Sequence, residues 1–168
     1  MSFNVSARQL WHPRFVQNLL ERLDGPTVDT ERMVLEVTES AAMADPDRTQ
    51  QTMETLRRRG VRFAIDDFGT GYSSLSRLKH LPVEVLKIDR SFVHDLPRDK
   101  DACSMVNAVI QLALSLGMTP LAEGIENPEQ WKFLVENGCA LGQGFHFARP
   151  VPAEEIERLG VQALLPAS

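Results

Sequence analysis

The chain has 168 residues, enough for one domain, because single domains commonly run to roughly 100–200 residues. Hydrophobic residues make up 43% and charged residues 24% of the sequence, which excludes a disordered or collagen-like chain. The net charge of −5 gives the chain no electrostatic basis for gripping duplex DNA, so duplex nucleic acid is not an expected partner.

The cysteine content and the length of the apolar stretches indicate in which cellular compartment the chain is expected. Cys103 and Cys139 are too few and too far apart for a disulfide scaffold or a zinc cluster. Reduced thiols and a cytoplasmic location are therefore expected. The longest mostly apolar stretch, residues 106–118, is interrupted by Asn107 and Gln111 and falls short of the ~20 apolar residues of a membrane span. We expect neither a secretory signal nor a membrane segment.

Short apolar runs alternate along the chain with longer amphipathic patterns. The runs are rich in β-branched or aromatic residues and are bounded by Gly, Pro or Asp, which predicts strands. A repeat of strand and helix favours parallel strands joined by right-handed crossovers, an α/β fold. In chain order, the predicted strands are 3–5, 33–37, 61–65, 83–88, 120–122 and 144–147, and the predicted helices are 13–23, 46–59, 74–79, 100–116, 128–137 and 153–159.

Several predicted helices have readable ends and faces. Two of them begin at an acidic or amide N-cap followed by proline, at Asp45–Pro46 and Asn127–Pro128. The helix over 100–116 should bury one face, because its apolar residues are spaced three and four apart. These residues are Met105, Val109, Leu112 and Leu116.

Several predicted strands contain or lead into a polar side chain near their carboxyl ends, and Gln143 enters the last of them. The carboxyl ends of parallel strands share one face of a sheet or barrel, where active sites are built. These side chains should therefore converge although they are far apart in the sequence. They are Asn4, Glu36, Asp66–Asp67, Lys87, Glu123 and Gln143.

The chemistry of this set is informative. Oxygen atoms of Asn, Asp and Glu are hard ligands that suit Mg²⁺ or Mn²⁺ better than zinc or copper. Carboxylates brought close together repel one another unless a cation lies among them. Lys87 adds a compact positive charge that can face a phosphate or an activated water. An acidic face with one lysine therefore indicates metal-assisted attack of water on a phosphate ester.

Each of these residues also has a plainer interpretation. Asp67 could cap a helix after the turn at 69–74, and Glu36 could be an exposed rim residue. Lys87 could be a solvated or salt-bridged lysine. The set is more persuasive than any member, because five apolar strands that end in polar groups cannot all be explained by caps.

Six segments of the sequence resemble the motifs of a known family and occur in the same order as in that family. They are NVSARQL (4–10), EVTES (36–40), DDFGTGYSSL (66–75), KIDRSFV (87–93), AEGIE (122–126) and QGF (143–145). Together they resemble the EAL-domain cyclic di-GMP phosphodiesterases over nearly the whole chain. The run from 66 to 75 is the most specific of them.

The resemblance implies a modified TIM barrel whose C-terminal face binds cyclic di-GMP. Two Mg²⁺ or Mn²⁺ ions there would help a water open one phosphodiester bond, giving the linear dinucleotide. The resemblance further implies that Asn4, Glu36 and Asp66 are ligands of one metal and that Asp67 is a ligand of the second. Such ions polarise the phosphoryl oxygen and lower the pKa of bound water.

The resemblance also assigns roles to residues around the metals. Lys87 and Glu123 are similar to the residues that hold and deprotonate the attacking water. Gln143 is similar to a residue that orders the second metal and its waters, and Glu126 is expected beside the substrate. Glu39 is similar to a glutamate that anchors the loop after the third predicted strand, a loop that the family uses at its dimer interface. A homodimer or other self-association is therefore expected.

One departure from the family is large, because the Glu-Ala-Leu segment that names it does not occur in this sequence. Relative to the family, the sequence starts inside the third of eight strands. We therefore expect residues 1–168 to form a single partial EAL domain, an incomplete TIM-like (β/α) barrel of about six parallel strands with flanking helices and without the family's first two strands. One metal ligand is then missing, and open edge strands favour association. Three outcomes stay open: a metal-dependent phosphodiesterase, a catalytically dead remnant that binds cyclic di-GMP or another protein, and a fragment that folds poorly.

Overall fold

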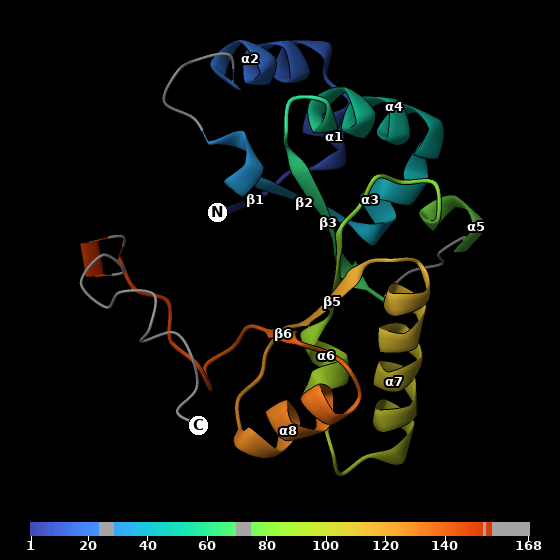
Figure 1. Ribbon diagram of the computed structural model, residues 1–168, viewed down its shortest axis with the longest axis vertical. Coiled ribbons are helices and arrows are strands. Elements are labelled where there is room, and N and C mark those ends of the chain that lie inside the picture. Colours follow the sequence, from blue (N-terminus) through green and yellow to red (C-terminus); the bar gives the residue numbers. More distant parts are fainter. Residues whose placement is uncertain (24–28, 70–74, 153, 156–168) are drawn as a thin grey trace.

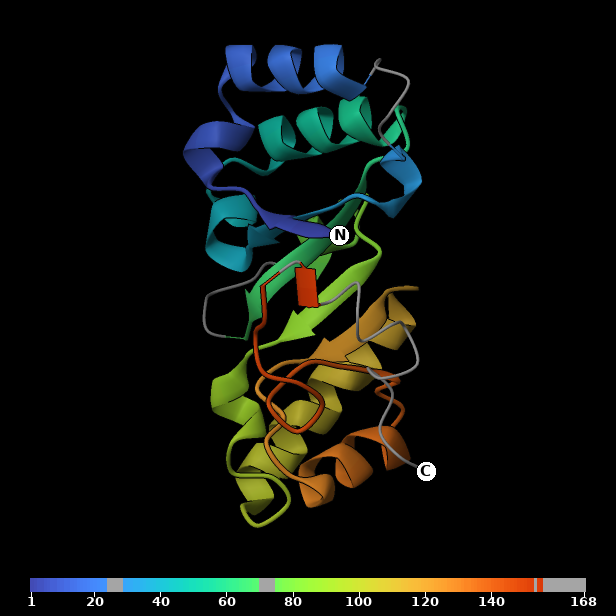
Figure 2. The same ribbon diagram turned by 90° about the vertical axis from the view of Figure 1, so that its left-hand side faces the viewer.

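The computed structural model describes residues 1–23, 29–69, 75–152 and 154–155, and its strands form one sheet. The sheet has six strands in the order β1-β2-β3-β4-β5-β6, and every neighbouring pair is parallel. The strands curl into an open half-barrel that is flanked by the helices (Figures 1 and 2). The prediction of an incomplete α/β barrel with about six parallel strands is confirmed.

The elements follow the expected alternation of strands and helices. The strands are β1 (Ser2–Asn4), β2 (Val34–Thr38), β3 (Arg62–Phe68), β4 (Val85–Ile88), β5 (Thr119–Ala122) and β6 (Leu141–Gly142). The helices are α1 (Ala7–Leu10), α2 (Pro13–Leu23), a 3-10 turn η1 (Thr30–Arg32), α3 (Glu39–Ala44), α4 (Pro46–Arg57), α5 (Leu75–Leu78), α6 (Arg90–Val93), α7 (Lys100–Ser115) and α8 (Pro128–Glu136).

Side-chain caps fix where the longer helices begin. α4 begins after Asp45, whose side chain accepts a hydrogen bond from the Arg48 N–H at 3.3 Å. α8 begins after Asn127, whose side chain accepts a hydrogen bond from the Gln130 N–H at 2.9 Å. α7 ends two residues before Gly117, which has a φ of 74° that favours glycine. The helix starts predicted from the N-cap and proline pairs are confirmed.

The two central strands are the most deeply buried part of the sheet. Phe63, Ala64 and Ile65 of β3 and Leu86 and Ile88 of β4 are all buried. Strands that are apolar on both faces are typical of parallel sheets covered by helices. They supply the fixed frame from which the polar residues at the strand ends project.

The apolar face of α7 differs from the predicted one. Met105, expected in the core, is 47% exposed, while Leu112 and Leu116 are only partly buried. α7 is apolar around much of its circumference, so more than one stripe has helical spacing, and packing against β4 and β5 selects between them. The buried residues of α7 are Val106, Val109, Ile110 and Ala113.

The predicted strand over 144–147 is wrong. The last strand is β6 at Leu141–Gly142, and residues 144–147 form a turn in which the Phe147 N–H donates to the Gly144 C=O at 3.1 Å. One of the aromatic residues that suggested a strand packs against helix α8 instead. Phe147 meets the ring of Trp131 edge to face, with 5.1 Å between the ring centroids.

The predicted helix over 13–23 matches α2, whereas most of the other predicted boundaries differ from the structure by a few residues. β3 runs on to Phe68, so that Asp66 and Asp67 lie inside the strand rather than after it. α5 ends at Leu78, one residue before the predicted end of the helix over 74–79, and residue 74 lies outside the described residues. Most of the predicted helix over 153–159 lies outside the described residues. In the ranges that the structure covers, no helix has the length and apolar character needed to cross a membrane.

β1 is an open edge of the sheet. Among the described strands it pairs with β2 alone. An apolar cleft beside it is lined mainly by Phe3, Phe15, Leu19 and Met33, and Phe3 is 44% exposed. The half-barrel therefore presents both backbone groups and apolar side chains at this edge.

Candidate active site at the carboxyl ends of the strands

Strand register brings the polar residues of the first three strands to one face. Asn4 is the partner of Glu36, and Glu36 is in turn the partner of Ala64 in β3. Asp66 lies two residues beyond Ala64, so it points to the same side of the sheet as Glu36. Convergence of these side chains is thus a consequence of parallel pairing.

Asp66 and Asp67 both face the site, which a regular strand would not allow. The register between β3 and β4 shifts between Ile65 and Phe68, and Asp67 has a φ of 54°. The left-handed backbone breaks the alternation of side chains at this point. As a result, ligand oxygens of Asp66, Asp67 and Glu123 all lie within 4.8 Å of one another.

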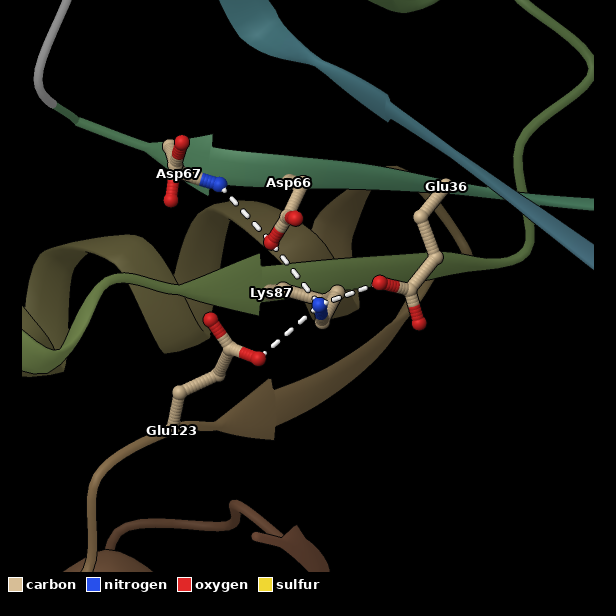
Figure 3. A network of polar contacts seen from close by, with 5 residues as sticks. All are labelled: Glu36, Asp66, Asp67, Lys87 and Glu123. Carbon is tan, nitrogen blue, oxygen red and sulfur yellow. Dashed lines mark hydrogen bonds and ion pairs between the residues drawn. The ribbon is translucent and has the colours of Figure 1, made fainter. Parts of the chain in front are cut away.

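Lys87 lies at the centre of the cluster (Figure 3). Its Nζ is 2.6 Å from Glu36 Oε2, 2.8 Å from Asp66 Oδ1 and 2.8 Å from Glu123 Oε1. The Lys87 side chain is 5% exposed, and the three N–H donors of its ammonium group are matched by these three oxygens. A solvated Lys87 is therefore the wrong interpretation, and Glu36, 12% exposed, is not a rim residue.

The hydrogen bonds at Lys87 hold it in the charged form. Burial by itself lowers the pKa of Lys87, but the hydrogen bonds to Asp66, Glu123 and Glu36 outweigh burial and raise the pKa. The pKa of Glu123 is also raised, chiefly because burial disfavours its carboxylate, with smaller contributions from the negative charges nearby and with Lys87 opposing the shift. Glu123 therefore takes up a proton more readily than an exposed glutamate.

Asp89 belongs to this site, although sequence reasoning did not single it out. Burial raises the pKa of Asp67, and the charges of Asp66 and Asp89 and a hydrogen bond with Asp89 raise it further. Burial also raises the pKa of Asp89, but hydrogen bonds from Ser91 and from the Arg90 backbone outweigh burial and lower it. The available signal was an acidic residue directly after β4. In the structure Asp89 is the N-cap of α6, and its Oδ1 accepts a hydrogen bond from the Ser91 N–H at 2.9 Å.

The donor set suits a hard divalent cation. Within the described ranges, Asp66, Asp67 and Glu123 form a group of three acidic residues close enough to share an ion. All three offer oxygen atoms, the ligands that Mg²⁺, Mn²⁺ and Ca²⁺ prefer. Burial and neighbouring negative charge raise the pKa of two of these carboxyl groups, Asp67 and Glu123, and a bound cation would relieve that repulsion. The residues present therefore fit a metal site.

Asn4 and Gln143 lie at opposite edges of the sheet, Asn4 on β1 and Gln143 just after β6. Asn4 is exposed at the open edge, where its strand register places it next to Glu36. Gln143 is exposed just after β6, and its backbone N–H donates to the Ala122 C=O at the end of β5, at 2.8 Å. Their assignments as a metal ligand and as an ordering residue stay predictions.

Glu39 and Glu126 have contrasting surroundings. Glu39 is buried, and its Oε2 accepts a hydrogen bond from the Gly69 N–H at 2.8 Å, at the point where the chain leaves β3. The role of Glu39 in anchoring the loop stays a prediction. Glu126 is exposed and lines a separate polar cleft together with His94, and its placement beside the substrate stays a prediction.

The fold and the site define an α/β half-barrel with a lysine-centred acidic cluster at the carboxyl ends of its strands. The family model described as the EAL domain matches residues 1–150. This chain therefore belongs to the EAL domain family.

Relatives of the chain include enzymes and solved complexes. The bifunctional diguanylate cyclase/cyclic di-GMP phosphodiesterase MucR of Pseudomonas aeruginosa is 42% identical over 156 residues, which are 93% of this chain and 23% of MucR. A solved complex of the PaMucR phosphodiesterase with c-di-GMP matches with a TM-score of 0.87 at 43% identity and covers 92% of this chain and 62% of that one. The manganese/cy-diGMP complex of Klebsiella pneumoniae BlrP1 matches with a TM-score of 0.80 at 34% identity. The match covers 89% of this chain and 38% of the BlrP1 chain.

Proposed function

We propose that this chain supplies the water-activating side of a cyclic di-GMP phosphodiesterase site, which opens one phosphodiester bond to give the linear dinucleotide. The observation that carries the proposal is the buried Lys87 ammonium group, held by Glu36, Asp66 and Glu123 at 2.6–2.8 Å. Phosphodiester hydrolysis needs positive charge beside the phosphate and a base for the water, and the cluster has both. The relatives MucR and PaMucR are phosphodiesterases, the latter solved with c-di-GMP.

Two divalent cations, Mg²⁺ or Mn²⁺, are the proposed cofactors. We assign Asn4, Glu36 and Asp66 to one cation and Asp67 to the second. Strand register pairs Asn4 with Glu36 and puts Asp66 on the same face of the sheet as Glu36, and ligand oxygens of Asp66 and Asp67 lie within 4.8 Å of each other. When bound, the cations polarise the phosphoryl oxygen and lower the pKa of the attacking water. The relative BlrP1 has been solved as a manganese/cy-diGMP complex, which supports manganese as the first ion to test.

We assign the remaining steps of the reaction to side chains of the chain itself. Glu123 accepts the proton of the attacking water, a role to which its raised pKa is suited. Lys87 positions the Glu123 carboxylate for that water through its ammonium group, and its positive charge offsets negative charge on the phosphate. Glu39 holds the loop after β3 through a backbone N–H. Gln143 and Glu126 are assigned to the surroundings of the substrate and the second cation.

The open edge at β1 is where we propose that further polypeptide completes the site. The matched region covers 62% of the PaMucR chain, so that structure contains additional polypeptide. An exposed parallel edge with an apolar cleft beside it is suited to pair with another strand. Residues 1–168 are then one partial domain, and self-association or homodimer formation is the expected behaviour while the edge is uncovered.

The test is conversion of cyclic di-GMP to the linear dinucleotide by the purified chain with Mn²⁺, followed by chromatography. We expect Glu123→Gln to abolish product formation and Glu129→Gln, which alters an exposed glutamate of α8, to preserve it. A second arm adds, ahead of β1, the segment that precedes the matched region in MucR. If the fusion forms product and the chain without it does not, the result supports a site completed across the β1 edge. If neither protein forms product at high enzyme concentration, the proposal is rejected.

A second candidate function is a module that binds cyclic di-GMP or another protein without turnover. The open β1 edge with its exposed Phe3 favours it, because such edges associate readily. Sedimentation velocity should show self-association that Phe3→Lys reduces and Phe145→Lys, at a distant exposed aromatic residue, does not. If calorimetry detects no nucleotide binding and sedimentation detects only monomer, this candidate fails.

A further inference from the structure

Gln130 of α8 is a buried amide that links two backbone segments next to the site. Its side chain is 2% exposed. The Oε1 atom accepts hydrogen bonds from the N–H groups of Glu126 at 2.8 Å and Asn127 at 3.2 Å. The Nε2 atom donates to the C=O groups of Val93 at 3.1 Å and His94 at 3.0 Å. Each polar atom of the amide thus has partners, as a buried polar group requires.

These bonds exceed what capping of α8 needs. In a capping box, the third helical residue returns one bond to the backbone of the N-cap residue, here Asn127. The bond to the Glu126 N–H and both bonds to carbonyl groups are additional. The carbonyl partners lie 36 and 37 residues away, at the end of α6, which lies close to α8 (Figure 1). The amide therefore joins the loop between β5 and α8 to α6.

Both joined segments lead directly to the catalytic cluster. The loop begins at Glu123, and α6 follows closely after β4, which carries Lys87. The two segments also touch at the other end of the loop. Gly124 has a φ of 69°, and a Cβ built on it would lie 2.5 Å from the Cβ of Arg90. The loop is thus held against α6 at two places, with Glu123 beside one of them.

We propose that Gln130 is a positioning residue, which clamps the loop that carries Glu123 against α6 and so keeps the Glu123 carboxylate on Lys87. Its catalytic consequence rests on the proposed function, whereas its effect on the Glu123–Lys87 contact does not. An amide is required at this place because the loop offers N–H donors and α6 offers C=O acceptors. A shift of Glu123 by a fraction of an ångström would misplace the group that meets the water.

Two variants separate clamping from capping. Gln130→Glu has nearly the same shape and keeps an acceptor for the loop, but as a carboxylate it has no donor for the α6 carbonyl groups. Gln130→Met removes both kinds of bond. The matched control is Asn137→Ala, because the Asn137 Nδ2 donates to the Phe133 C=O at 2.7 Å at the other end of α8. This control weakens the same helix without touching the clamp.

The metal-free readout is the ¹⁵N NMR signal of the Lys87 ammonium group, assigned by its loss in Lys87→Arg. Three short hydrogen bonds and burial should protect this group from exchange and make it visible. We expect Gln130→Glu to shift or broaden the signal and Asn137→Ala to leave it in place. An unchanged signal in Gln130→Glu, or an equal change in Asn137→Ala, overturns the proposal. If Gln130→Met does not fold, Gln130→Glu alone decides.

Hydrolysis of cyclic di-GMP with Mn²⁺ supplies the second readout. We expect Gln130→Glu to lower kcat at least about tenfold with KM changed less than about twofold, because the substrate contacts remain while the base is misplaced. A wild-type kcat in Gln130→Glu overturns the proposal. If neither the wild-type chain nor its fusion with the MucR segment has turnover, the proposed function fails, and the Lys87 signal still decides whether Gln130 positions Glu123.

Discussion

Replacing Lys87 by methionine tests whether the ammonium group holds the carboxylates of the site together. In the wild-type chain, Lys87 Nζ lies 2.6–2.8 Å from oxygens of Glu36, Asp66 and Glu123, and its side chain is 5% exposed. Methionine keeps much of the apolar volume of the lysine stem but has no charge and no donor. The three carboxylates would then face one another without a positive charge between them.

The expected loss of stability is about 3–5 kcal/mol, the usual cost of removing one partner from a buried ion pair. Three carboxylates lose a partner, but their side chains are 12–17% exposed, so that water still reaches them and the cost does not triple. The pKa of Lys87 is raised by folding. Its stabilising contribution is therefore fully present below the ordinary lysine pKa of about 10.4, and a measurement at pH 7 captures it.

The assay is urea denaturation of both proteins at pH 7 in the absence of divalent cations. Lys79→Met is the control, because Lys79 is exposed, and it should change stability by less than about 0.5 kcal/mol. Addition of Mn²⁺ should restore part of the stability of Lys87→Met, since a cation can take the place of the lost charge. If Lys87→Met unfolds at the same urea concentration as the control, Lys87 does not hold the carboxylates of the site together.

Two further predictions concern packing and thiol chemistry. Gly124→Ala should destabilise the fold by more than Gly117→Ala. Both glycines have a positive φ, which costs a residue with a side chain about 1–2 kcal/mol, but a Cβ on Gly124 would also clash with Arg90, whereas a Cβ on Gly117 would lie in open space. Urea denaturation of both variants measures the difference. Burial raises the pKa of the Cys139 thiol to about 11, and Cys103 is less buried. At pH 8.5 a thiol reagent should therefore modify Cys103 and should modify Cys139 only after the chain is denatured. Rapid labelling of both thiols in the native protein would contradict this prediction.

Much of the fold could be predicted because its signals are local. The caps at Asp45 and Asn127 act on backbone groups three residues away, and each confirmed helix start depends on them. The apolar runs of the central strands are likewise readable, since a strand buried on both faces needs only a few consecutive apolar residues. The order of elements then restricts the sheet to parallel pairing, which places Glu36, Asp66 and Glu123 at one rim.

Where the sequence offered two local solutions, only the tertiary structure chose between them. Met105 and Val106 of α7 lie on adjacent stripes that both have helical spacing, and contact with the sheet buries Val106. The aromatic residues 145 and 147 suggest a strand, but the chain turns at that place so that Phe147 packs on Trp131. Hydrophobic periodicity records which residues are apolar and not which neighbour they will meet.

The acidic cluster around Lys87 shows the same division between sequence and structure. Residue types and their positions at strand ends determined that acidic groups and one lysine would share a rim. The tertiary structure decided that Lys87 binds Glu36 across 51 positions of sequence, and that a left-handed backbone turns Asp67 toward Asp66. The reason is physical: local patterns fix backbone conformation over a few residues, whereas distances between side chains depend on strand register, a shift in that register and burial, which exist only once the strands have paired.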